Sequence, residues 1–241
     1  MKSIGSIRLV SGLTKVKLNN AGLADLPSDV LRPEYNRAAL KPGILHIGVG
    51  NFHRAHQSWY LHRLMQQGEA LDWAIVGAGV RAYDMEMRAR LVAQDYMTTL
   101  IELSPKGHST EVVGSMIDYV QIEDGNGALI ARMSQPDIRI VALTVTESGY
   151  YVDPVNNAFH TAHPDIEHDV QHPDAPRTAF GAMVAALRER RAAGAGPFTG
   201  QSCDNLQGNG DILRQTVVGL ARLQDPDLAE WINETCSFPN S

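Results

Sequence analysis

Residues 43–56 read GILHIGVGNFHRAH, and this stretch decides the fold. Its first half is a short apolar run bounded by glycines: Ile44, Leu45, Ile47 and Val49. A run of this length is too short for a helix and is typical of a strand buried on both faces of a parallel sheet. The stretch therefore predicts a buried strand that leads into a glycine turn and then into a helix.

Two glycines, Gly48 and Gly50, follow the predicted strand as G-x-G. The first permits a tight turn, and the second lets a pyrophosphate approach the amides and the dipole of the next helix. The complete dinucleotide fingerprint is G-x-G-x-x-G, but here His53 replaces the third glycine and Ala55 is the nearest small residue. A plain turn is the alternative. The candidate cofactor-binding residues are Gly48, Val49, Gly50, Asn51, Phe52 and His53.

The composition is that of an ordinary globular protein: 241 residues, 44% hydrophobic and 20% charged. A net charge of −6 argues against nucleic acid as a partner. No apolar run is long enough to span a membrane, and no leader is apparent, so we expect a cytoplasmic protein without a membrane partner. Cys203 and Cys236 are too few for a disulfide framework, so we expect reduced thiols.

A second buried strand is predicted over residues 73–80, and a helix over 52–67 connects it to the first. In such a β-α-β unit an acid just beyond the second strand binds the adenosine ribose, and Asp84 is the acid available. An acid there disfavours a 2′-phosphate and so favours NAD over NADP, although the neighbouring Arg81 weakens this argument. The alternative for Asp84 is a cap on the following helix.

The rest of the chain continues the α/β pattern. Residues 1–42 predict an extended arm, residues 96–103 and 111–122 a hairpin-like insertion, and residues 150–175 a long surface loop. Further strands are expected at 138–145, centrally in the sheet, and at 198–203, with helices at 128–133, 177–193, 210–223 and 228–234. The expected fold is a Rossmann-type open, mostly parallel sheet with helices on both faces and a β-rich insertion.

Polar residues follow two of these strands, where open α/β sheets bind ligands. Thr146 begins the sequence TESG after the strand at 138–145, and a turn with a solvated glutamate is the alternative. Asn205 follows the strand at 198–203 and can donate its amide to a substrate oxygen, as an oxyanion-stabilising group does, or can cap the next helix.

Histidines gather in two places, the pair His53 and His56 and the loop at 160–172, and such groups are candidate metal ligands. Neither set has the ligand spacing of known zinc sites, and we expect no metal. A G-x-S-x-G elbow is also absent from the sequence, which argues against serine hydrolysis.

The motifs HIGVGNFHRAHQ, LDW, AQDY, LTVTESGY, HPDAPRTAFG, RRAAG, SCDNLQGNG and SFPN occur in this order. From about Ala24 to Ser241 the chain thereby resembles the polyol-specific long-chain dehydrogenases, the mannitol dehydrogenase family. Fructuronate reductase, tagaturonate reductase and D-arabinitol 4-dehydrogenase share these motifs. The resemblance implies metal-independent, NAD-linked interconversion of a sugar alcohol and a ketose.

The resemblance also implies site residues. It places Gly48, Gly50, Phe52 and Asp84 against NAD, with Arg81 beside the adenosine and Thr146 nearer the nicotinamide. Asn205 matches half of an oxyanion hole. Two departures stand out: Tyr83-Asp84 replaces an acid pair, which leaves NADP open, and Gly200-Gln201 changes the packing beneath Asn205.

Finally, the resemblance divides the chain. Residues 1–42 are expected to pack as an arm on an NAD-binding domain at 43–241. The family's helical catalytic domain supplies a lysine general base, in a K-x4-N-x2-H pattern that has no counterpart here. We therefore expect this chain alone to bind NAD weakly and to turn over no substrate. A dinucleotide-binding module without chemistry is the alternative.

Overall fold

A five-stranded parallel sheet forms the centre of the molecule. The computed structural model describes residues 16–105, 107–153 and 158–241. The strands lie in the order β6-β3-β2-β7-β8, namely β6 (Met116–Tyr119), β3 (Ala74–Ala78), β2 (Pro42–Ile47), β7 (Ile140–Leu143) and β8 (Thr199–Ser202). Every pairing between them is parallel. The strand predicted from residues 43–49 is therefore confirmed as the middle strand, and the strand predicted at 138–145 lies inside the sheet beside it.

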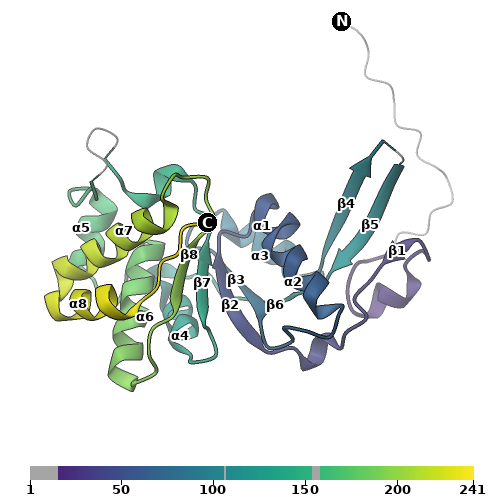
Figure 1. The fold of residues 1–241 in the computed structure, drawn as a ribbon, viewed down its shortest axis with the longest axis horizontal. Helices are drawn as coiled ribbons and strands as arrows, with labels where there is room; N and C mark the ends of the chain where they lie inside the picture. The colour runs from purple at the N-terminus through teal and green to yellow at the C-terminus, as the bar shows by residue number, and fades with distance from the viewer. Residues whose placement is uncertain (1–15, 106, 154–157) are drawn as a thin grey trace, which may run out of the picture.

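The strand order reverses direction at β2, because β3 and β6 lie on one side of it and β7 and β8 on the other. Right-handed crossovers then place helices on both faces of the sheet. One face carries α1 (Asn51–Ala55), α2 (Gln57–Met65) and α3 (Asp84–Val92), and the other carries α4 (Gly127–Ser134) and α6 (Ala179–Ala193). Beyond α6 and β8 pack α5 (Pro164–Gln171), α7 (Asn209–Gln224) and α8 (Pro226–Thr235) (Figure 1). The predicted α/β class with helices on both faces is confirmed.

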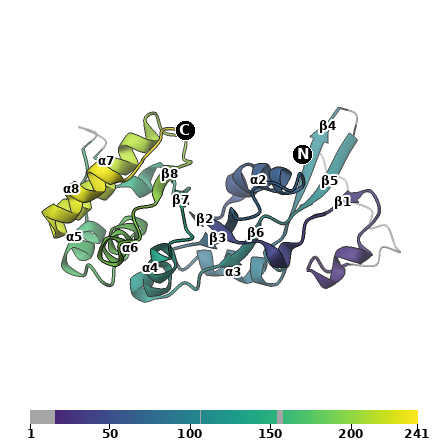
Figure 2. The ribbon, with the colours of Figure 1, turned by 60° about the horizontal axis from the view of Figure 1, so that its bottom comes forward.

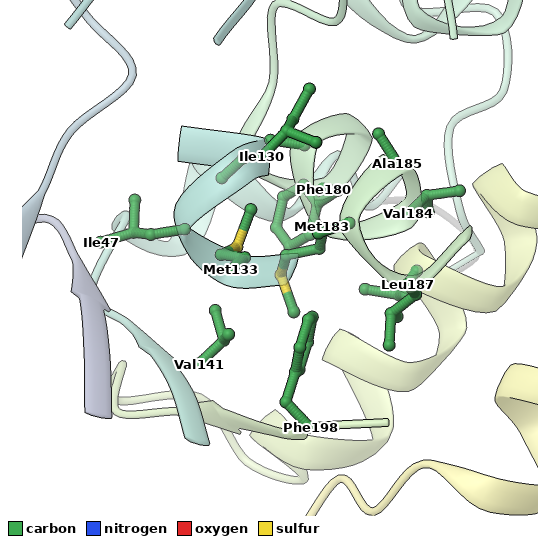
Figure 3. Packing of buried hydrophobic residues seen from close by; sticks show 14 of the residues in the cluster. Ile47, Ile130, Met133, Val141, Phe180, Met183, Val184, Ala185, Leu187 and Phe198 are labelled. Atoms are coloured by element: carbon green, nitrogen blue, oxygen red, sulfur yellow. The ribbon is translucent and has the colours of Figure 1, made fainter. Parts of the chain in front are cut away.

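Side chains alternate between the two faces along each strand. Leu45 and Ile47 contact the residues of α4 and α6, whereas Ile44 contacts those of α2 and α3. Figure 3 shows Ile47 and Val141 of the sheet next to Met133 of α4, with Met183 of α6 in the same cluster. Burial on both faces explains why these strands are continuous apolar runs rather than alternating ones.

The β-rich insertion is a separate sheet in the order β1-β5-β4, made of β1 (Val30–Leu31), β5 (Gly107–Val113) and β4 (Thr98–Ser104). Its hairpin projects away from the helices of the other half (Figures 1 and 2). The predicted hairpin is present as β4 and β5, but the assignment of all of 111–122 to it is wrong, because β5 ends at Val113 and β6 joins the main sheet. The chain turns at Gly114, where a Cβ would lie 2.8 Å from Pro33 and 2.9 Å from Arg37.

Two further predictions need correction. The helix predicted over 52–67 is broken at His56 (φ −120°, ψ −89°) into α1 and α2. His53 and Ser58 are both buried, and on one continuous helix they would point about 140° apart. The loop predicted over 150–175 contains α5, which begins at Pro164, and Ile166 of this helix is fully buried.

The described part of the arm, from residue 16, contains two short 3-10 helices, Ala21–Asp25 and Arg37–Ala39, besides β1. Two others lie at Asp124–Asn126 and Glu147–Tyr150. Residues 1–15 of the predicted arm and 154–157 of the predicted loop lie outside the described residues. Within those that are described, no helix is long and apolar enough to cross a membrane.

Candidate functional site

A cleft of about 710 Å³ opens at the carboxyl ends of β2, β7 and β8. It lies at the point where the strand order reverses, which is where open α/β sheets bind their ligands. Its lining comes from four segments of the chain: Gly48, Gly50, Asn51, Phe52, Thr144, Thr146, Cys203, Asp204, Asn205 and Ser241.

The two glycines of the turn are required for different reasons. Gly48 has a φ of +89°, and a Cβ on it would overlap the carbonyl oxygen of Thr144, so the protein itself excludes a side chain there. Gly50 is the N-cap residue of α1, and the nearest atom to its missing Cβ, the Gly48 oxygen, is 3.9 Å away. The space beside Gly50 belongs to the cleft. It leaves room for a ligand group that must approach the backbone closely.

Two buried histidines, His46 and His53, lie on either side of this turn in the sequence and pack against each other. The rings of His46 and His53 stack with centroids 3.6 Å apart, and both are fully buried. Burial lowers the pKa of His46 to about 3 and that of His53 well below its usual value. Both rings are therefore neutral, and neither faces the cleft as a base.

The other wall of the cleft is formed by the residues that follow β7. Thr146 has a φ of +68° and a ψ of 159°, a backbone conformation that residues with a side chain rarely adopt. Its amide donates to Asp204 at 3.1 Å, and the amide of Val145 donates to the same carboxylate at 2.9 Å. Asn205 follows Asp204 and is exposed at the cleft. It does not cap α7, since the side chain oxygen of Asn240 accepts from the amides of Gly210 and Asp211.

Asp84 lies after β3, and its side chain turns back over Gly79. One carboxylate oxygen accepts from the amides of Val80 and Arg81, each at 3.1 Å. Burial raises the pKa of Asp84, while these two bonds oppose the shift. Arg81 lines a second, smaller pocket of about 150 Å³ that also includes Val145, Tyr151 and Phe180.

The structure thus brings six of the candidate residues into one cleft: Gly48, Gly50, Asn51, Phe52, Thr146 and Asn205. Val49 and His53 are buried, and Arg81 and Asp84 lie by the loop after β3. Thr144, Cys203 and Asp204 also line the cleft but were not among the candidates from the sequence. Their signal was available, because each is a polar residue just beyond the end of β7 or β8.

The family model for the mannitol dehydrogenase Rossmann domain matches residues 42–241. The chain is 58% identical to a mannitol 2-dehydrogenase of Cereibacter sphaeroides over 88% of its own length and 44% of that protein. It superposes on a ternary complex of Pseudomonas fluorescens mannitol 2-dehydrogenase with NAD and D-mannitol with a TM-score of 0.89 and 46% identity, covering 92% of this chain and 46% of the other.

The chain belongs to the mannitol dehydrogenase family. A substrate-free D-sorbitol dehydrogenase also superposes on this mannitol dehydrogenase Rossmann domain, with a TM-score of 0.85 and 38% identity over 92% of this chain and 46% of the other. The chain therefore spans less than half the length of the relatives it matches.

Gly200 and Gln201 of β8 both make contacts with distant residues in this mannitol dehydrogenase domain. Gly200 is buried against Phe238, whose ring would lie 2.7 Å from an added Cβ. Gln201 accepts a hydrogen bond from Gln57 of α2 at 3.3 Å. The small residue in β8 thus makes room for the last residues of the chain, which pack on β8 and α7 beside the cleft.

Over residues 16–105, 107–153 and 158–241, no three His, Cys, Asp or Glu side chains are grouped so that they could hold a metal ion.

Proposed function

We propose that this chain binds NAD in the cleft and forms the cofactor-binding half of an enzyme that interconverts a sugar alcohol and a ketose of the mannitol and fructose type. The observation that carries the proposal is the open space beside Gly50, at the reversal of strand order, in a Rossmann domain of this family. The 46% identical relative solved with NAD and D-mannitol supports it.

In this proposal, the diphosphate lies over residues 48–53, where the absence of a side chain at Gly50 leaves room for it. Asp84 binds the ribose with the carboxylate oxygen that the amides of Val80 and Arg81 leave available. Arg81 lies beside the adenosine, and Thr146 lies nearer the nicotinamide. If the domain accepts NADP, Arg81 is the residue proposed to bind its 2′-phosphate.

The oxidation of an alcohol requires three functions: a hydride acceptor, a base for the hydroxyl proton, and donors for the negative oxygen that develops. NAD, when bound, accepts the hydride. Asn205, exposed at the cleft, is the proposed donor to the oxygen.

A base is not found among the described residues that line the cleft. Asp204 already accepts three hydrogen bonds, and burial raises the pKa of Cys203 to about 11. The general base is therefore proposed to lie in a second domain, as in the family. The 241-residue chain by itself should then bind NAD and turn over no substrate.

The test is a calorimetric titration of the purified chain with NAD and NADP, followed by assays with mannitol, arabinitol and fructuronate. The expected result is saturable NAD binding without turnover by the chain, and turnover of mannitol by a protein that also contains the second domain. Mannitol-dependent NAD reduction by the chain alone would contradict the proposed division of labour. Turnover of fructuronate, tagaturonate or arabinitol instead of mannitol would change the substrate, and binding without turnover in the longer protein would favour a dinucleotide-binding module.

A further inference from the structure

The carboxylate of Asp204 connects two walls of the cleft. It lies just beyond the end of β8, yet it accepts hydrogen bonds from the amides of Val145 and Thr146, beyond the end of β7, at 2.9 and 3.1 Å. A third bond comes from the hydroxyl of Tyr150 at 2.7 Å. Both carboxylate oxygens are used, and all three donors belong to the segment 145–150.

The third bond is part of a short buried chain. The hydroxyl of Tyr150 is also 2.6 Å from that of Ser202, and both residues are fully buried. Because the tyrosine proton is directed at Asp204, Ser202 donates to the tyrosine oxygen. Two residues at or just beyond the end of β8, Ser202 and Asp204, are therefore hydrogen-bonded to the segment that follows β7.

The backbone of Thr146 needs such a restraint. With φ at +68° and ψ at 159°, it occupies a region that is nearly exclusive to glycine, and strain of this kind persists only where the surroundings impose it. Thr146 and Asn205 both line the cleft, and Asp204 is bonded to the first and adjacent in sequence to the second.

We propose that Asp204 is a positioning residue, which holds Thr146 in its strained conformation and so sets the shape of the cleft for the cofactor. Its effect on NAD binding rests on the proposed function. The restraint on Thr146 does not rest on the proposed function, because the hydrogen bond from its amide to Asp204 is present without the cofactor.

The main variant is Asp204→Asn. An asparagine has the same shape but one acceptor oxygen, and its amide group cannot accept from a backbone N–H. The matched control is Tyr150→Phe, which removes one hydrogen bond to the same carboxylate. The amides of Val145 and Thr146 still donate to Asp204 in this variant. The buried Ser202 hydroxyl loses the tyrosine oxygen as its acceptor. Both variants should lower the melting temperature. Only Asp204→Asn should weaken NAD binding about tenfold, and Tyr150→Phe should change it by less than about twofold.

A rescue separates positioning from general damage. Glycine adopts positive φ readily, so Thr146→Gly should relieve the need for the restraint. The double variant Asp204→Asn with Thr146→Gly is expected to bind NAD more tightly than Asp204→Asn alone. It should not regain the melting temperature.

Hydrogen exchange of the chain without cofactor gives the second readout. The amides of Val145 and Thr146 should exchange faster in Asp204→Asn and stay protected in Tyr150→Phe. Unchanged exchange in Asp204→Asn, an unchanged dissociation constant, or affinities that simply follow melting temperature across the variants would overturn the proposal. If the unmodified chain fails to bind NAD, the proposed function fails, and the exchange data still decide whether Asp204 restrains Thr146.

Discussion

The hydroxyl of Thr144 donates a 2.6 Å hydrogen bond to the carbonyl oxygen of Gly48. This bond joins the end of β7 to the turn after β2, the two strands at which the sheet order reverses. The same hydroxyl oxygen lies 3.1 Å from Nε2 of His46 and accepts its proton, because its own proton is used by Gly48. The glycine turn is therefore stabilised by the side chain of Thr144, a residue that is not part of the G-x-G motif.

Replacing Thr144 with valine keeps the shape and removes both bonds. Nε2 of the buried His46 would then lose the Thr144 hydroxyl as its acceptor, and Nδ1 of the same ring has no hydrogen-bond partner among the described residues. Thr144→Val should lower the free energy of unfolding by about 2 kcal/mol and weaken NAD binding. Urea denaturation and calorimetric titration measure the two effects. Thr144→Ser, which retains the hydroxyl, is the control, and equal losses in both variants would show that the methyl group matters rather than the hydrogen bonds.

The two turn glycines should respond differently to alanine. Gly48→Ala combines positive φ with overlap against the backbone of Thr144, so it should cost at least about 3 kcal/mol of stability. Gly50 has an ordinary φ of −93° and open space beside it. Gly50→Ala should change stability by no more than about 0.5 kcal/mol and weaken NAD binding about tenfold. Undiminished NAD affinity in Gly50→Ala would place the diphosphate elsewhere.

Asp84→Asn tests the ribose assignment. The asparagine oxygen can still accept from the amides of Val80 and Arg81, so the loop after β3 should keep its conformation. Removing the charge ends its repulsion of a 2′-phosphate, and Arg81 remains nearby. The ratio of the NADP to the NAD dissociation constant should fall about tenfold. An unchanged ratio would reduce Asp84 to a structural role in the loop.

Stability should fall as the solution becomes acidic. His46 and His53 have pKa values below the usual 6.5 because of burial, so below pH 6.5 the unfolded chain binds protons that the folded chain refuses. The free energy of unfolding therefore decreases with falling pH, by roughly 1 kcal/mol for His46 at pH 5.5, and His53 contributes in the same direction. For His46 the loss continues to about pH 3. Urea midpoints at pH 7.5 and 5.5 measure it, with a His53→Gln variant expected to show a shallower dependence.

Local pattern was sufficient for most of the elements. The apolar runs at 43–49, 73–80 and 138–145 correspond to β2, β3 and β7, and the glycine turn lies at the carboxyl end of β2 as predicted. Helices at 127–134 and 179–193 also match the periodicity. These features depend on residues close together in the chain, which is why they can be predicted from sequence.

The failures were in places where distant contacts override local preference. The break at His56 brings both His53 and Ser58 onto the buried side, where His53 stacks on His46 and Ser58 bonds to Ser115. Just after β5, Gly114 packs against Pro33 and Arg37, which are about 80 residues away in the chain. No window of sequence contains both partners of such a contact.

For this protein, the sequence by itself determined the parallel α/β fold, the glycine turn and the family, because strand burial, helix period and motif order are written along the chain. Only the tertiary structure decided which polar groups meet: Thr144 with Gly48, Asp204 with Thr146, and Asp84 with the loop it closes. Hydrogen bonds act over about 3 Å, so their partners are known only once the strands are placed side by side.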